Sequence, residues 1–136
     1  MIVIDASALT KYIFKEEGWG EVRKALEKGV VSVDHVVKEV ANAIWKKCVV
    51  LKLEPVDVAY KRHQLLHKII QGGVVVLESE SKYLEEAFKI AFEGEMTVYD
   101  SLYIAQALKL RAQLLTSDVR QARVAEKLSI PTRYIP

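Results

Sequence analysis

Short apolar segments recur along this chain, with longer helical patterns between them. The segments are residues 2–5, 30–33, 74–77, 114–117 and 132–135, and most of them show no regular alternation of polar and apolar side chains. Strands that are covered by helices on both faces have this composition, because neither face meets water. The pattern therefore predicts an α/β fold in which a short parallel β-sheet is flanked by α-helices.

The intervening segments carry apolar residues at helical spacing. Helices are expected over residues 6–15, 20–28, 36–51, 55–71, 81–92, 97–111 and 119–128. A length of 136 residues fits a single domain over 1–136. The start of the chain does not resemble a signal peptide, no apolar run reaches the roughly 20 residues that span a membrane, and the single cysteine excludes an internal disulfide. A cytoplasmic location is expected.

Four carboxylates are candidate functional residues because of their positions relative to the predicted strands and helices. Asp5 and Asp118 come directly after predicted strands, and in open parallel sheets ligands bind beyond the carboxyl ends of the strands. Glu39 and Asp100 lie on the apolar sides of predicted helices. Carboxylates that meet in one place cannot all remain ionised without a cation. Oxygen ligands alone favour Mg²⁺ or Mn²⁺ over zinc.

Each of these acids also has a structural interpretation that the sequence leaves open. Asp5 and Asp118 are suited to capping the helices that follow them. Thr97 and Asp100 have the spacing of a capping box. Glu39 can be a solvated helix residue. His35, at the start of a predicted helix, is interpreted as a solvated or capping residue.

Hydroxyl, amide and basic side chains surround the acidic positions. A supporting shell of oxygen and nitrogen donors is predicted at Ser7, Asn42, Thr116 and Ser117, and candidate contacts to a polyanion backbone are Lys11, Lys38 and Arg120. The formal net charge of +2 is too small to argue nucleic-acid binding by itself. A divalent ion held by the acids would activate a water for attack on a phosphodiester.

The same residues resemble the motifs of a known family. Val3-Ile4-Asp5-Ala6-Ser7, Glu39-Val40-Ala41-Asn42-Ala43, Thr97-Val98-Tyr99-Asp100-Ser101 and Leu114-Leu115-Thr116-Ser117-Asp118 are similar, in order and spacing, to the four motifs of the PIN-domain ribonucleases, and within them to the VapC-type toxins of prokaryotic toxin–antitoxin pairs. Ser101 stands where alanine is common.

This resemblance implies a PIN-like fold with a twisted sheet and with Asp5, Glu39, Asp100 and Asp118 at one end. It also implies Mg²⁺- or Mn²⁺-dependent endoribonuclease activity, a homodimer and a small cognate antitoxin. A catalytically silent PIN-fold module that binds RNA or protein is the alternative. A phosphotransferase of the haloacid-dehalogenase type is disfavoured, because Ser7 occupies the place of its second aspartate.

Overall fold

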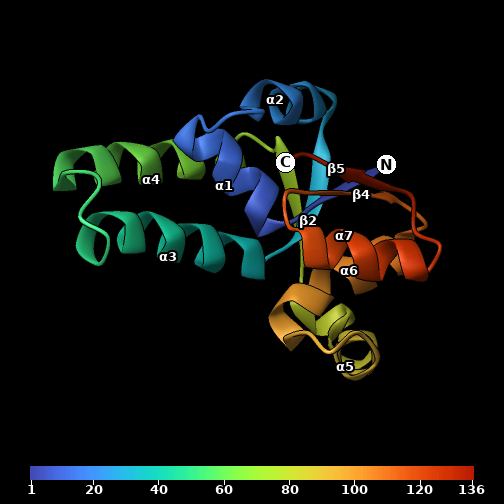
Figure 1. Ribbon diagram of the computed structural model, residues 1–136. Coiled ribbons are helices and arrows are strands. Elements are labelled where there is room, and N and C mark those ends of the chain that lie inside the picture. Colours follow the sequence, from blue (N-terminus) through green and yellow to red (C-terminus); the bar gives the residue numbers. More distant parts are fainter.

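The computed structural model describes residues 1–136 and contains one five-stranded, entirely parallel sheet (Figure 1). Its strands are β1 (Ile2–Ile4), β2 (Val30–Val33), β3 (Val75–Glu78), β4 (Gln113–Thr116) and β5 (Thr132–Tyr134). They lie in the order β3-β2-β1-β4-β5. The expected α/β class and all of the expected strands are confirmed.

Helices separate successive strands. They are α1 (Ala6–Phe14), α2 (Trp19–Lys28), α3 (His35–Val49), α4 (Val56–Gln71), α5 (Leu84–Gly94), α6 (Val98–Leu110) and α7 (Val119–Lys127). Crossovers between parallel strands are right-handed, so the reversal of strand order between β3 and β4 puts the later helices on the opposite face. In Figure 1, α1, α3 and α4 gather on one side of the strands, and α5, α6 and α7 gather on the other.

The expected helix over residues 81–92 is the one element that differs in kind. The segment begins with a short 3-10 helix, η1 (Glu80–Lys82), and α5 starts only at Leu84. The Ser79 side chain accepts a hydrogen bond from the backbone of Ser81, and the Tyr83 hydroxyl donates to Glu78 at 2.6 Å. These contacts tie the segment to the end of β3 and make the chain turn before the α-helix begins.

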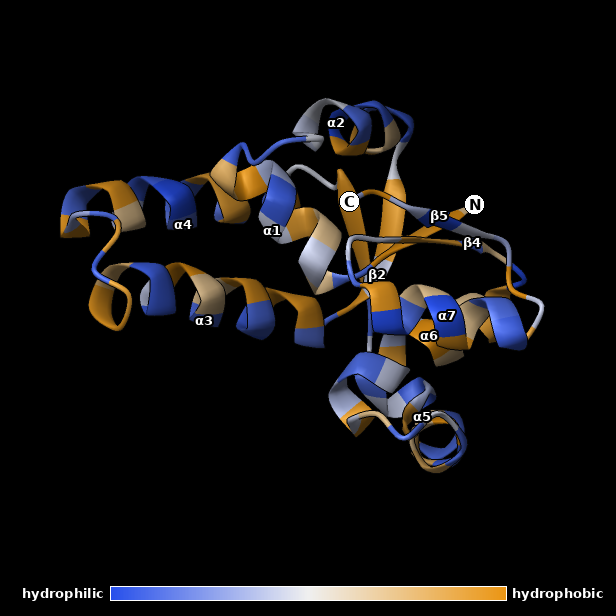
Figure 2. Cartoon of the chain, viewed as in Figure 1, coloured by the Kyte–Doolittle hydropathy of each residue, from blue (hydrophilic) through white to orange (hydrophobic).

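The core lies between the sheet and both helical layers and comprises 31 buried apolar residues. Figure 2 shows β1 and β2 in hydrophobic colours, whereas the helices alternate between hydrophobic and hydrophilic residues. Helix α6 is the most enclosed of them, because every residue from Ser101 to Ala107 is buried, including the polar Ser101 and Gln106. Since α6 is enclosed in this way, the side chains that it directs toward the sheet are held firmly. None of the helices is both long and apolar enough to cross a bilayer.

The order in which the chain adds strands to the sheet reverses between the neighbouring strands β1 and β4. From β1 the chain moves toward β2 and β3, and from β4 it moves toward β5. The pairing of Ile4 with Leu115, extended by a hydrogen bond of 3.2 Å from the Asp5 amide to the Leu115 carbonyl, brings the ends of β1 and β4 together. Ligand sites form at such a switch point in open parallel sheets.

Candidate acidic site at the sheet edge

Asp5 directly follows the carboxyl end of β1, the central strand of the sheet, and is completely buried. It caps α1, as its Oδ1 atom accepts hydrogen bonds from the Ala8 amide at 2.9 Å and from the Ser7 hydroxyl at 2.7 Å. The Thr116 hydroxyl donates to Oδ2. Both carboxylate oxygens are therefore fixed by the protein, and the capping interpretation of Asp5 is correct.

The hydroxyl groups around Asp5 link its two strands. The Ser7 hydroxyl lies 3.2 Å from that of Thr116 and accepts a hydrogen bond of 2.8 Å from the Ser117 amide. Thr116 also accepts a hydrogen bond of 3.0 Å from the Asp118 amide. Three members of the predicted supporting shell thus occur where the sequence suggested. Asn42 does not line the same pocket and lies on the neighbouring surface of α3.

Glu39 projects from the first turns of α3 and is held by a residue from α6. The Tyr103 hydroxyl, on a completely buried side chain, donates to Glu39 Oε1 at 2.5 Å. His35 Nε2 lies 3.3 Å from the same oxygen. Glu39 is therefore not the solvated helix residue of the alternative interpretation, because one of its oxygens is engaged on two sides while Oε2 accepts no hydrogen bond from the protein.

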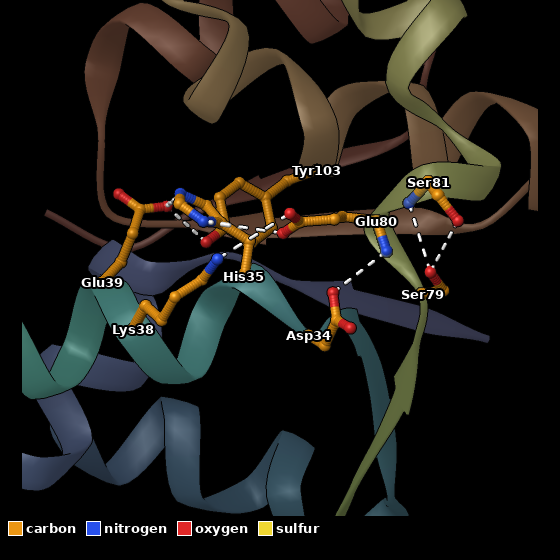
Figure 3. Close-up of polar contacts among 8 residues, drawn as sticks. All are labelled: Asp34, His35, Lys38, Glu39, Ser79, Glu80, Ser81 and Tyr103. Atoms are coloured by element: carbon orange, nitrogen blue, oxygen red, sulfur yellow. Dashed lines mark hydrogen bonds and ion pairs between the residues drawn. The ribbon is translucent and has the colours of Figure 1, made fainter.

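The interpretation of His35 as a solvated or capping residue is wrong. His35 is only 9% exposed, and its ring stacks on Tyr99 with 5.0 Å between ring centroids. Figure 3 shows it between Glu39 and Glu80, whose Oε2 atom lies 3.7 Å from His35 Nδ1. The cause is tertiary: η1 and α6 close over the first turn of α3 and exclude water from this ring.

Asp100 and Asp118 complete the acidic set from α6 and α7. The Thr97 hydroxyl accepts a hydrogen bond of 3.2 Å from the Asp100 amide, so Thr97 caps α6. Asp118 caps α7 by accepting a hydrogen bond of 3.1 Å from the Gln121 amide at its Oδ1 atom. Neither carboxylate forms a salt bridge, so each retains oxygen atoms for another ligand.

Glu39, Asp100 and Asp118 line one open pocket of about 430 Å³, whereas the buried Asp5 does not line it. The remaining lining residues are Ala6, Ser7, Thr10, Lys11, Glu16, Ala43, Ser117 and Gln121. The pocket thus collects carboxylates from α3, α6 and α7, which are far apart in sequence. Lys11 is the single basic residue on its wall.

The electrostatic balance of this site opposes the ionised form of its acids. Burial raises the pKa of Asp5 from 3.8 to about 7, and the charge of Asp118 adds to this effect. Burial, followed by the charge of Asp118, raises the pKa of Asp100. Burial also raises the pKa of Glu39, with a smaller contribution from Asp100. The site therefore favours either protons or a cation.

This donor set fits a hard divalent ion in its chemistry, because it consists of carboxylate and hydroxyl oxygens that repel one another when ionised. The fit is not that of a closed cage, since no three carboxylate, histidine or cysteine side chains converge tightly enough to enclose an ion. Two basic residues lie near these acids. His35 acts electrostatically on both Glu39 and Asp100, and Arg120 acts on Asp100. Together they compensate only part of the negative charge.

Sequence reasoning missed two residues that shape this site. The sequence pattern assigned no role in the site to Tyr103, yet its hydroxyl donates a hydrogen bond to Glu39. A signal was present, because a tyrosine at a core position requires a hydrogen-bond partner for its hydroxyl. Glu16 lines the pocket from the segment after α1, and no motif in the sequence pointed to it.

Comparison with known proteins defines the class. The model of the PIN-domain family matches residues 2–127, so the chain belongs to the PIN-domain family. Within this family it is similar to Ribonuclease VapC3 of Pyrobaculum aerophilum, with 30% identity over 132 residues that cover 96% of this chain and 98% of the relative. A crystal structure of PAE2754 from the same organism has a TM-score of 0.65 and 25% identity, and the match covers 93% of this chain and 90% of that one.

Proposed function

We propose that this protein is a metal-dependent endoribonuclease and the toxin component of a VapBC-type toxin–antitoxin pair. The observation that supports this most directly is the acidic pocket, which Glu39, Asp100 and Asp118 line together with Ser7, a hydrogen-bond partner of the buried Asp5, and in which Lys11 is the single basic residue. The similarity to Ribonuclease VapC3 over almost the whole chain gives the pocket a substrate class, which is RNA.

Asp5, Glu39, Asp100 and Asp118 would hold Mg²⁺ or Mn²⁺. When bound, such an ion lowers the pKa of a water nucleophile and offsets the charge that develops on the phosphodiester. The protein's own contribution is to orient the ligands. Ser7 and Thr116 fix Asp5, and Tyr103 engages Oε1 of Glu39 and leaves Oε2 free of protein donors. Outer partners of this kind set ligand geometry and affinity.

Basic side chains near the pocket are proposed to bind the RNA backbone. Lys11 lines the acidic pocket, and Lys38, on α3, lines the neighbouring pocket. Arg120, on α7, acts electrostatically on Asp100. We propose that each neutralises a phosphate that flanks the cleaved bond, and such contacts make affinity fall with salt. A homodimer, a small cognate antitoxin and a cytoplasmic location belong to the same proposal.

Purified Asp100→Asn and Asp5→Asn chains test the nuclease function. We expect the wild-type protein to cut a single-stranded RNA with Mg²⁺ or Mn²⁺ and to stop when EDTA is added, and we expect both variants to be folded and inactive. Asp57→Asn, which changes an exposed aspartate on α4, is the matched control and should retain activity. Full activity in either site variant would refute the assignment.

The toxin role needs a separate test. Co-expression with the product of a small neighbouring reading frame should suppress RNA cleavage and yield a complex that survives size-exclusion chromatography. Mapping of cut sites with and without that product identifies the RNA target. Cleavage that is unaffected by every neighbouring product would leave a nuclease without a toxin–antitoxin role.

A further inference from the structure

A second open pocket adjoins the acidic one and is not explained by the residues that would hold a metal. It has a volume of about 340 Å³ and is lined by His35, Lys38, Glu39, Asn42 and Tyr99. Glu39 lines both pockets, so the second begins where the acidic pocket ends. An extended ligand that occupies the acidic pocket reaches this one without leaving the surface.

The Tyr99 ring forms one wall of this second pocket. Tyr99 is 62% exposed although it lies in the first turn of α6, directly before Asp100. One face of its ring stacks on His35 with an interplanar angle of 16°. An aromatic ring that is supported on one side and open to solvent elsewhere is a stacking surface for a second flat group.

The ring under Tyr99 is buried. His35 is buried and lies between two carboxylates, with Nε2 at 3.3 Å from Glu39 and Nδ1 at 3.7 Å from Glu80 (Figure 3). Lys38 approaches the other oxygen of Glu80 at 3.8 Å. Because the supporting ring is buried, less conformational freedom is lost when a ligand stacks on Tyr99.

The polar groups around Tyr99 match the remaining parts of a nucleotide. Lys38 provides a positive charge for a phosphate. Asn42 is exposed and carries both a hydrogen-bond donor and an acceptor, as the edge of a base requires. Aromatic stacking together with a lysine and an amide is a common means of binding unpaired bases in RNA.

We propose that Tyr99 stacks on an unpaired RNA base of the nucleotide that adjoins the phosphodiester at the acidic pocket, with Lys38 on its phosphate and Asn42 at its edge. This subsite rests on the proposed ribonuclease function. A base inside a duplex has both faces covered by its neighbours and cannot stack on a protein ring. The subsite therefore selects single-stranded or looped RNA and sets the position of the cut relative to the bound base.

Steady-state cleavage of a short single-stranded RNA with Mn²⁺ tests the subsite. Removal of one stacked base from an aromatic ring weakens binding, so Tyr99→Leu should raise KM by about 5–100-fold while kcat stays within about threefold. Tyr99→Phe and Tyr99→Trp keep a ring and should remain within about threefold of wild type in KM. Tyr60→Leu, which changes a tyrosine that is 68% exposed on α4, is the matched control and should behave as wild type.

Binding of the same RNA, measured by fluorescence anisotropy in Asp118→Asn chains, separates the two proposals. If Tyr99→Leu weakens binding but the wild-type chain cuts no RNA, the subsite stands and the nuclease function is refuted. If the wild-type chain cuts RNA with the same KM and affinity in Tyr99→Leu, the subsite is refuted and the nuclease function stands. A change from dimer to monomer by light scattering in Tyr99→Leu would show that a second copy covers Tyr99, and would also overturn the subsite.

Discussion

Burial of Asp5 makes the stability of the metal-free protein depend on pH in an unusual direction. Its pKa rises from 3.8 to about 7 mainly because burial removes the carboxyl from bulk solvent. Between these two values the folded protein keeps a proton on Asp5 that the unfolded chain has already lost. The free energy of unfolding therefore falls as pH rises through this window, whereas an ordinary salt-bridged aspartate would make it rise.

The size of the effect follows from the same two values. At about 1.4 kcal/mol for each pH unit, a change from 3.8 to about 7 corresponds to about 4 kcal/mol of lost stability once Asp5 is ionised. About 3 kcal/mol of this loss falls between about pH 5 and about pH 8. Asp5→Asn removes the titrating group and keeps the shape of the side chain, so it should remove this part of the pH dependence.

Urea unfolding in EDTA at about pH 5 and about pH 8 measures the difference directly. The wild-type free energy of unfolding should decrease between the two conditions by about 3 kcal/mol more than that of Asp5→Asn. Asp57→Asn, at an exposed position, serves as the control and should follow the wild type. Equal pH dependence in wild type and Asp5→Asn would show that Asp5 is already ionised at low pH, and the argument from burial would be wrong.

Three further predictions concern the groups around Asp5 and Glu39. Tyr103→Phe removes the hydroxyl that donates to Glu39. Mn²⁺ binding in calorimetric titration should weaken by about 10–100-fold, without loss of the fold. Unchanged affinity would show that this contact does not position Glu39. Thr116→Val removes a buried donor to Asp5 and should lower the free energy of unfolding in urea by about 1–3 kcal/mol; no loss would contradict a structural role for this hydrogen bond. Mn²⁺ at about 100 times its Kd should stabilise the wild-type protein by about 2.7 kcal/mol in thermal unfolding at about pH 8, and it should do so less at about pH 5, where Asp5 is protonated.

The elements that place the acidic site were predictable because local patterns determine them. The apolar runs before Asp5 and Asp118 identify two buried strands, and parallel strands deliver the residues at their ends to one edge. The helical spacing around Asp100 likewise indicates which side of α6 faces the sheet. Pattern and site agree here because each acid lies within a turn of a regular element.

The contacts to Glu39 were not predictable in the same way. Whether His35 is solvated or buried depends on η1 and α6, which close over it from positions far along the chain. The partner of the Tyr103 hydroxyl depends on how α6 is rotated against α3. Helical periodicity defines a side of a helix, but it does not state which residue of another helix that side meets. The complete burial of Asp5 has the same origin, since the Thr116 hydroxyl arrives from the other end of the sequence.

The adjacency of β1 and β4 has a consequence for the order of events during synthesis. The ribosome releases Asp5 and Glu39 early, but the Ser7 and Thr116 hydroxyls that meet at the site are separated by 109 positions in the chain. Until β4 has emerged and paired with β1, the nascent chain lacks both Asp118 and the hydroxyl that fixes Asp5. The acidic pocket is therefore among the last features to assemble, and a growing chain whose β4 is still inside the ribosome does not yet carry a complete site.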